Sequence, residues 1–319
     1  MVIRPFIQRS NRACSILYRY IKGQKKGVWL LPVNVCPDVP LTFSLADIPF
    51  EFVDINSETL CIDVDECIRR TRKRRNYYIG VVYVRTYGYL FDTTEVFNSL
   101  KSDNSEFIVI DDRCLCIPDT EPDFYGADMI LYSTGHCKQI DLGTGGLALF
   151  DKNPDIAFED VDLLYDGTDE VSIYKKSYED NTPLDSIPKG WLRLEFYDNY
   201  NGYLNQIKNK VSHRISQRES INSVYKSSLP EEIQLSSKYQ NWRFNIRVSP
   251  KYKDKILKSL FNENLFAGSH YHSANKLYDT TVYKNSDALY GEILNLFNDD
   301  YYTVDKATQT CELINKIIH

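Results

Sequence analysis

The sequence predicts an α/β protein, with a mostly parallel sheet flanked by helices and a smaller C-terminal α+β part. Short apolar runs alternate with helical or loop stretches over the first 150 residues, which is typical of a parallel sheet. Residues 175–190 are polar, contain two prolines and a glycine, and read as a linker. We therefore expect a large domain over 1–180 and a small domain over 181–319.

The individual elements follow from hydrophobic spacing. Residues 11–22 carry apolar side chains at helical spacing, and Ser10 stands where an N-cap is expected. Buried strands are expected at 28–31, 50–53, 79–84, 107–110, 129–132 and 147–150. In the C-terminal part, helices are expected at 203–226, 250–263, 286–297 and 303–318, and a half-exposed strand at 242–248.

Charge and composition argue against several classes of partner. The 319 residues are 26% charged and 43% hydrophobic with a formal charge of −6, which is ordinary for a globular protein and disfavours nucleic acid or an anionic membrane. No apolar run has the length of a membrane span, and the first residues do not form a signal peptide. The basic run at 69–75 is either a nucleic-acid or targeting patch or the last turn of a helix, and the acidic total favours the helix end.

The eight cysteines suggest the cellular compartment. No two of them form a CxxC pair, and the histidines show no zinc spacing. A chain of this length needs neither disulfides nor a structural metal to fold. We expect reduced thiols, a cytoplasmic location and no metal site.

Residues with chemical potential are concentrated between 107 and 150. The strand at 107–110 runs into Asp111 and Asp112, and ligands of open α/β sheets bind beyond the carboxyl ends of strands. Tyr132-Ser133 follows the next strand, and Lys138 comes five residues after that serine. The segment 143–146 is Gly-Thr-Gly-Gly, which permits unusual dihedral angles and close approach of a ligand to the backbone.

These residues resemble the signature of the DegT/DnrJ/EryC1/StrS group, which are sugar aminotransferases of the fold-type I pyridoxal-phosphate class. That group has an acidic pair ending a strand, then an aromatic-Ser pair, a lysine five residues later and G-x-G-G starting five residues after the lysine. Asp111-Asp112, Tyr132-Ser133, Lys138 and 143–146 keep these spacings. Further similarity covers 10–14, 27–32, 52–60 and Tyr87-Gly88, and is weaker over 210–319.

The resemblance implies roles for the residues at the centre of the pattern. Lys138 would hold pyridoxal phosphate as a Schiff base and would then act as the general base. Asp112 would keep the pyridine nitrogen protonated, which makes the ring an electron sink. Asp111 should point away from the cofactor because successive strand side chains alternate.

The resemblance also implies a phosphate site. Ser133 matches the phosphate-binding serine of the group. Ser10, Asn11 and Arg12 would add backbone amides at a helix N-terminus and a guanidinium. His136, two residues before Lys138, is equally well explained as a second acid/base or stacking group and as an ordinary loop histidine.

Several positions depart from the pattern of the group. The glutamine or histidine that contacts the cofactor's ring hydroxyl is replaced by Leu115, and the aromatic residue that stacks on the ring is replaced by Cys36. The glycine of the first motif is Asn11. The asparagine-containing segment that reaches the partner subunit's cofactor is expected near residue 193, where only Asn199 and Asn201 are close. His270-Tyr271 resembles a pair near the substrate pocket.

The function implied is that of a pyridoxal-phosphate-dependent aminotransferase. It would move an amino group from an amino acid, with glutamate expected, to a nucleotide-linked keto-sugar in surface glycan biosynthesis, and it would act as a homodimer. Two alternatives remain. One is other pyridoxal-phosphate chemistry on a sugar, such as dehydration, although the known dehydratases of the group lack the lysine. The other is a catalytically silent member of the group that acts as a binding subunit.

Overall fold

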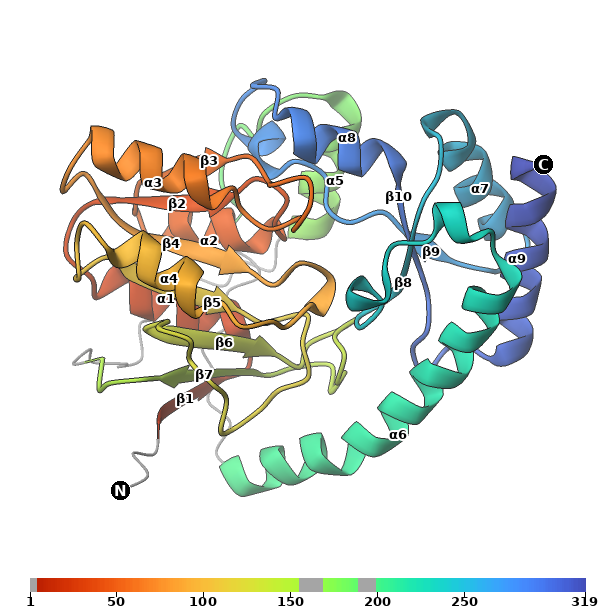
Figure 1. Ribbon diagram of the computed structural model, residues 1–319, viewed down its shortest axis with the longest axis horizontal. Helices are drawn as coiled ribbons and strands as arrows, with labels where there is room; N and C mark the ends of the chain where they lie inside the picture. The colour runs from red at the N-terminus through yellow and green to blue at the C-terminus, as the bar shows by residue number, and fades with distance from the viewer. Residues whose placement is uncertain (1–4, 155–168, 189–198) are drawn as a thin grey trace.

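A seven-stranded sheet forms the centre of the first half of the molecule. The computed structural model describes residues 5–154, 169–188 and 199–319 (Figure 1). The strands are β1 (Phe6–Ser10), β2 (Val28–Pro32), β3 (Phe50–Val53), β4 (Tyr78–Val84), β5 (Ile108–Asp112), β6 (Met129–Ser133) and β7 (Gly146–Phe150). They lie in the order β1-β7-β6-β5-β4-β2-β3. Strand β7 is antiparallel to β1 and β6, and the pairs from β6 to β3 are parallel.

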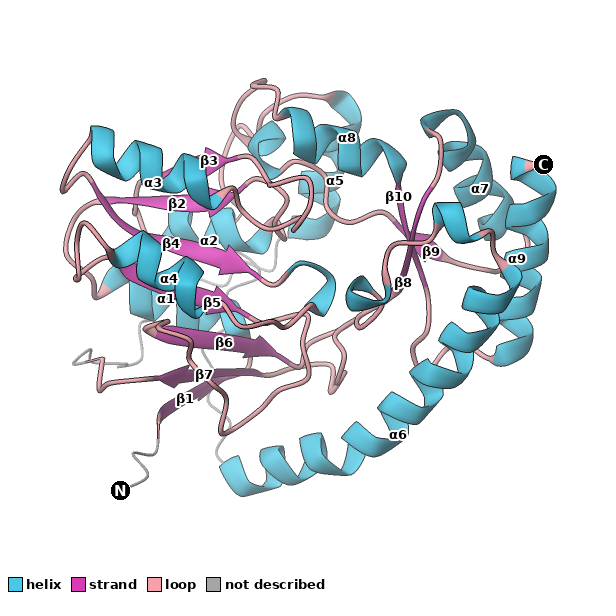
Figure 2. Cartoon of the chain, viewed as in Figure 1, coloured by secondary structure: helices cyan, strands magenta, loops and turns pink. Residues whose placement is uncertain are grey.

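Helices cover both faces of this sheet (Figure 2). One face packs against α1 (Ala13–Lys22) and α2 (Asp38–Leu45), and the other against α3 (Val64–Lys73) and α4 (Thr94–Lys101). The alternating side chains of β2 show the division, because Trp29 faces the first layer and Leu30 faces the second. All five residues of β2 are buried, as expected for a central strand covered on both faces.

The C-terminal part contains a second, antiparallel sheet. Its strands are β8 (Phe244–Arg247), β9 (Ala267–Gly268) and β10 (Ile293–Leu296), in the order β8-β10-β9. The associated helices are α5 (Glu170–Asp180), α6 (Tyr200–Ser228), α7 (Pro250–Asn262), α8 (Lys284–Glu292) and α9 (Val304–Ile318). Short 3-10 helices are η1 (Thr86–Gly88), η2 (Glu231–Ile233), η3 (Ser237–Tyr239) and η4 (Ala274–Leu277).

Helix α6 connects the two sheets (Figure 1). Near its start, Tyr203 and Ile207 pack into the core beneath β6 and β7. Near its end, Ile221 and Tyr225 pack into the core of the three-stranded sheet. One rigid element therefore contacts both halves, and the loop after Lys138 lies along it.

Most of the expected elements are confirmed. The six strands predicted for the first half are present within two residues of their expected bounds, and the C-terminal part is α+β as predicted. Strand β1 was not expected, because only part of its short, mixed sequence is buried. It ends at Ser10, so the prediction of Ser10 as N-cap of the first helix is wrong: the N-cap of α1 is Arg12.

Two predicted segments are wrong. Residues 293–296, taken as the end of a helix, form β10, which pairs with β8; a short apolar run does not distinguish helix from strand. Residues 175–180, taken as linker, complete α5, which is capped by the Asp169 side chain and ends at Asn181 in a left-handed conformation. The division at residue 180 stays a prediction.

The basic run ends helix α3, as predicted. Its arginines pair with carboxylates, including Arg70 with Glu66 and Arg72 with Asp103. None of the helices in the described ranges is long and apolar enough to cross a membrane.

Candidate cofactor-binding site

The two neighbouring aspartates of β5 face opposite sides of the sheet. Asp111 is fully buried on the α3/α4 side, where Arg85 binds both of its carboxylate oxygens at 2.6 and 2.8 Å and Arg113 donates at 2.9 Å. Asp112 is 5% exposed and accepts a hydrogen bond from the Cys114 backbone amide at 2.9 Å. The expectation that Asp111 points away from the site agrees with this geometry.

Asp112 and Lys138 are near enough for the charge of each to affect the pKa of the other. Burial raises the pKa of Asp112, while the hydrogen bonds from Cys114 and the charge of Lys138 oppose that rise. Burial alone would lower the pKa of Lys138, but the acidic groups around it, Tyr271 first and Asp112 among them, outweigh burial and raise this pKa. The structure thus brings together the predicted amine and the predicted carboxylate, which are 26 residues apart in the chain.

Lys138 opens into a cavity of about 350 Å³. Its walls come from both halves of the molecule. They comprise Cys36, Pro37, His136, Cys137, Tyr174, Lys175, Tyr178, Trp242, Ser269, His270, Tyr271, His272 and Tyr290. The walls are mainly aromatic, and His272 stacks on Tyr178 with ring centroids 4.2 Å apart. A cavity whose aromatic walls carry amine, imidazole and hydroxyl groups is suited to a small molecule with polar substituents.

The glycine segment brings the first helix to this edge of the sheet. Gly146 pairs with Ser10 on one side and with Ser133 on the other. A Cβ atom on Gly146 would lie 2.4 Å from the Ala13 nitrogen, so glycine is required where the N-terminus of α1 packs on β7. The backbone amide of Gly145 donates to the Asn11 carbonyl at 2.6 Å. Ser10, Asn11 and Ser133 therefore lie at one end of the sheet, beside the first turn of α1.

Two carboxylates stand near the predicted phosphate site. The Arg12 guanidinium lies 3.9 Å from Glu170 of α5. Burial raises the pKa of Asp38, at the start of α2, and the charges of Arg12 and Lys138 oppose the rise. Asp38 was missed from the sequence, although it follows the carboxyl end of β2, where ligands of such sheets bind.

The structure shows the environments of Leu115 and Cys36, two positions that depart from the expected pattern. The Leu115 side chain is buried in an apolar cluster with Tyr87 and Trp242, while its backbone carbonyl accepts a hydrogen bond from Gln139 Nε2 at 2.8 Å. Cys36 lines the cavity, and burial raises the pKa of its thiol to about 12, so the thiol is neutral.

The remaining predicted residues differ in their placement. The His136 side chain is 84% exposed, 4.0 Å from Asp141, at the mouth of the cavity. His270 is held by Asn295 inside the cavity wall, and burial lowers its pKa to about 4, so it is neutral. The asparagine segment expected near residue 193 lies outside the described residues. Asn199 caps α6 by accepting from the Gly202 amide.

The set of groups fits a phosphorylated pyridine aldehyde. Such a group needs an amine for its aldehyde, a carboxylate for its ring nitrogen and donors for its phosphate. Lys138 and Asp112 supply the first two. The N-terminus of α1 and the Ser133 hydroxyl supply donors at the same end of the sheet. Over the described ranges, no cluster of three or more histidine, cysteine or acidic side chains could hold a metal ion.

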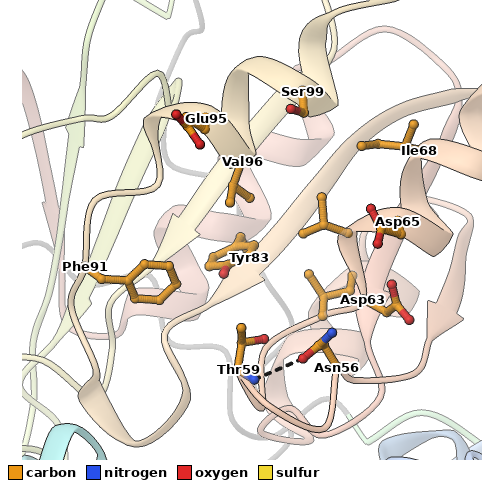
Figure 3. Close-up of a pocket in the computed structure, with 12 residues that line it drawn as sticks. Asn56, Thr59, Asp63, Asp65, Ile68, Tyr83, Phe91, Glu95, Val96 and Ser99 are labelled. Carbon is orange, nitrogen blue, oxygen red and sulfur yellow. Dashed lines mark hydrogen bonds between the residues drawn. The ribbon is translucent and has the colours of Figure 1, made fainter.

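A second cavity, of about 330 Å³, opens between α3 and α4 (Figure 3). Its lining includes the carboxylates of Asp63, Asp65 and Glu95 and the rings of Tyr83 and Phe91. Asp63 has a structural role there, because its side chain caps α3 by accepting from the Glu66 amide. None of the predicted site residues lines this cavity, so the candidate site is the one at Lys138.

Comparison with known proteins supports the fold through structure alone. Neither a protein-family model nor a curated protein sequence matches the chain. It superposes on a DegT DnrJ EryC1 StrS aminotransferase from Brucella abortus with a TM-score of 0.70 at 14% identity, covering 99% of this chain and 86% of that chain. On DesI with its TDP-sugar product it superposes with a TM-score of 0.74 at 13% identity, covering 97% of this chain and 80% of that chain. On NtdA from Bacillus subtilis with bound cofactor PMP the TM-score is 0.70 at 15% identity, covering 99% of this chain and 74% of that chain. The chain thus has the fold of these aminotransferases, and the predicted fold is confirmed.

Three groups near Lys138 were missed from the sequence. Trp242 contacts the lysine loop from the C-terminal part, and Tyr178 lines the cavity from the end of α5, a segment predicted to be a linker. Arg218 reaches Gln139 from α6. The sequence could have indicated Arg218. Basic residues recur every four positions in a predicted helix, at Lys210, Arg214 and Arg218, which places them on one face.

Proposed function

We propose that this protein is a pyridoxal-phosphate-dependent aminotransferase that acts on a nucleotide-linked keto-sugar, with glutamate as amino donor. The observation that carries the proposal is that Lys138 lines a cavity and that its charge and that of the buried Asp112 influence each other's pKa, although Asp112 itself does not line the cavity. The fold supports it, because the similar structures include a sugar aminotransferase holding its TDP-sugar product.

Each of the predicted site residues has a role that follows from its position. Lys138 lines the cavity, and its raised pKa keeps the amine protonated in the protein without cofactor. The amine would have to give up that proton when the cofactor binds before it could act as a general base. The Asp112 carboxylate, on the cofactor side of β5, would face the ring nitrogen, and Ser133 with the N-terminus of α1 would bind the phosphate. Pyridoxal phosphate would supply the electron sink for the reaction.

The cavity walls account for the expected substrate class. The stacked rings of Tyr178 and His272 and the other aromatic side chains of the wall offer apolar surface to the apolar face of a sugar ring. We infer a homodimer, since proteins that resemble this chain complete their sites across two subunits, and a role in surface glycan synthesis. The eight free cysteines support a cytoplasmic location.

A reductive trapping experiment tests the proposal. The full chain is mixed with pyridoxal phosphate, its visible spectrum is recorded, and the complex is reduced with borohydride and mapped by mass spectrometry. We expect a visible band, and a label on Lys138 that is absent from K138A. The matched control K175A removes another lysine of the cavity wall and should keep the label on Lys138. A band that changes when glutamate is added supports transamination.

Other outcomes would contradict parts of the proposal. A label at another lysine removes the role of Lys138. A labelled protein whose spectrum ignores amino acids favours the silent binding subunit, for which the apolar surroundings of Leu115 are the specific argument. A labelled protein that changes a sugar without an amino donor would indicate dehydration. Light scattering that shows monomers alone would contradict the homodimer.

A further inference from the structure

The backbone carbonyls of the residues before and after Lys138 accept hydrogen bonds from side chains in the C-terminal part of the chain. Trp242 Nε1 donates to the Cys137 carbonyl at 2.6 Å, and Arg218 Nη2 donates to the Gln139 carbonyl at 3.0 Å. Trp242 is 3% exposed and Arg218 is 5% exposed. The backbone around the reactive lysine is therefore fixed at both neighbouring residues, by donors more than 75 residues away in sequence.

One face of α6 supplies most of these donors. Lys210, Arg214 and Arg218 are spaced by four residues, which places them on the same side of a helix. Lys210 Nζ donates to the Asp141 carbonyl at 2.7 Å, and Arg214 Nε donates to the Gln139 carbonyl at 3.4 Å. Lys210, Arg214, Arg218 and Trp242 are called the loop clamp below.

Folding stability alone does not explain the loop clamp. Burial and the guanidinium groups of Arg214 and Arg243 lower the pKa of Arg218 to about 9, so the charged form of Arg218 is disfavoured where it lies. Nε of Arg218 and Nη2 of Arg214 are buried and have no hydrogen-bond partner. Apolar side chains in such positions are commonly as stable as buried ions, or more so.

The loop is held partly by its own contacts, since the Cys137 and Gly143 amides donate to the Asp141 carboxylate and Ile140 is fully buried. Residues 135–143 form no helix or strand and begin and end with glycine. Cys137, beside Lys138, has a φ of 62°, a left-handed conformation that side chains other than glycine rarely adopt. Those contacts leave the Cys137 and Gln139 carbonyls without a donor from within the described residues of the loop, and the side chains of Trp242, Arg214 and Arg218 donate to them. Loss of these donors would free the backbone on either side of Lys138 and with it the position of the amine.

We propose that the loop clamp positions Lys138 for its reaction with the cofactor, so that the C-terminal part of the chain sets the reactivity of a residue in the N-terminal half. Lys210, Arg214, Arg218 and Trp242 are positioning residues, which act through the backbone of 137–141. This inference rests on the proposed function for the reaction of Lys138, but the geometry of the loop can be tested without it.

Conservative variants separate positioning from folding. R218K keeps a positive charge but replaces the planar fork, whose two nitrogens donate to the Gln139 side-chain and backbone oxygens, with a single nitrogen on a different stem. W242F keeps an aromatic ring against Tyr87 and loses the donor. The control K208M removes a charge from the exposed surface of the same helix. Circular dichroism and urea unfolding identify the variants that keep the wild-type fold.

Two readouts then follow the loop and the lysine. Hydrogen exchange of peptides covering 136–143, measured without cofactor, should be about tenfold faster in R218K and W242F, the factor expected for one lost hydrogen bond to a charged or well-aligned donor. The rate of acylation of Lys138 by acetic anhydride, measured against pH, should also change. Trapping of pyridoxal phosphate at Lys138 should slow by a similar factor, and K208M should match wild type in all three.

The outcomes are distinguishable. Unchanged exchange in folded R218K and W242F would overturn the loop clamp. Faster exchange with unchanged acylation and trapping of Lys138 would overturn its positioning role. A wild-type protein that never binds pyridoxal phosphate would refute the proposed function, while exchange and acylation would still decide the loop clamp.

Discussion

Of the two neighbouring aspartates of β5, we expect Asp111 to contribute to folding stability and Asp112 to contribute to cofactor binding. Asp111 faces two guanidinium groups in a fully buried position, with contacts of 2.6 to 2.9 Å. D111N keeps the shape of the side chain but removes the negative charge and turns an amide toward these donors. Breaking a buried ion pair on one side costs about 3–5 kcal/mol, so we expect a loss of that size in the free energy of unfolding. Cofactor affinity of the protein that remains folded should be preserved.

We expect D112N to keep its stability without cofactor and to lose cofactor binding. Because burial raises the pKa of Asp112, its carboxylate form is disfavoured in the folded protein without cofactor. A carboxyl with a raised folded pKa contributes stability below its unfolded pKa of about 3.9, and loses that contribution as pH rises through the folded value. D112N cannot lose a proton, and its oxygen can still accept from Cys114. Without cofactor it should therefore equal wild type at acid pH and be at least as stable at pH 7.

Urea unfolding of both variants, at several pH values and with or without pyridoxal phosphate, measures this division. Wild type should be stabilised by added cofactor, since a ligand that binds only the folded state raises its stability. D112N should show little of that stabilisation, whereas D111N should show it from a lower starting point. If D112N without cofactor is destabilised at pH 7 as strongly as D111N, then both aspartates are structural and the assignment of Asp112 to the cofactor is refuted.

Three other substitutions test separate features. G146A places a methyl group against the Ala13 backbone, so it should cost about 1–3 kcal/mol by urea unfolding and weaken binding of pyridoxal phosphate in a spectral titration. T303A removes the side-chain cap that accepts from the Lys306 amide, so it should lower stability by about 1 kcal/mol with unchanged cofactor binding. Burial lowers the pKa of His270 to about 4, so its stabilising contribution is present above pH 6.5 and lost as pH falls toward 4. H270Q should therefore lose less stability than wild type between pH 7 and 4.5, and an equal loss would contradict the assignment.

The sequence predicted the elements whose pattern is local. Strand β4, with seven buried residues in succession, is identifiable from its apolar run alone. Strand β10 is not, because Ile293–Leu296 becomes a strand through pairing with β8, about 50 residues away. Helix α6 was expected, but its inward face could not be identified from hydrophobicity, since Arg214 and Arg218 are buried on it.

In the candidate site too, some residues could be predicted from local sequence patterns and others depend on tertiary packing. Asp112, Ser133 and Lys138 lie at or just after the ends of strands that are close in the sequence, and the resemblance to the DegT/DnrJ/EryC1/StrS signature predicted that they serve one site. Trp242 and His272 enter the same cavity from the C-terminal part, and their approach depends on how that part packs against the first. Local patterns predict the reactive groups of such a site, and tertiary packing determines the walls around them.

Leu115 illustrates why a departure at one position must be judged with its neighbours. Its side chain contributes to the apolar cluster around Trp242, and its carbonyl accepts from Gln139, whose own oxygen accepts from Arg218. The loop after Asp112 and the loop of Lys138 are thus joined by one amide side chain, which is held in turn by α6. Replacing leucine by a hydrogen-bonding residue would bury an amide among apolar groups, at a cost of about 1–3 kcal/mol unless it found a partner. The position therefore serves the geometry between the carboxylate and the amine, and any tuning of the cofactor ring has to come from other residues.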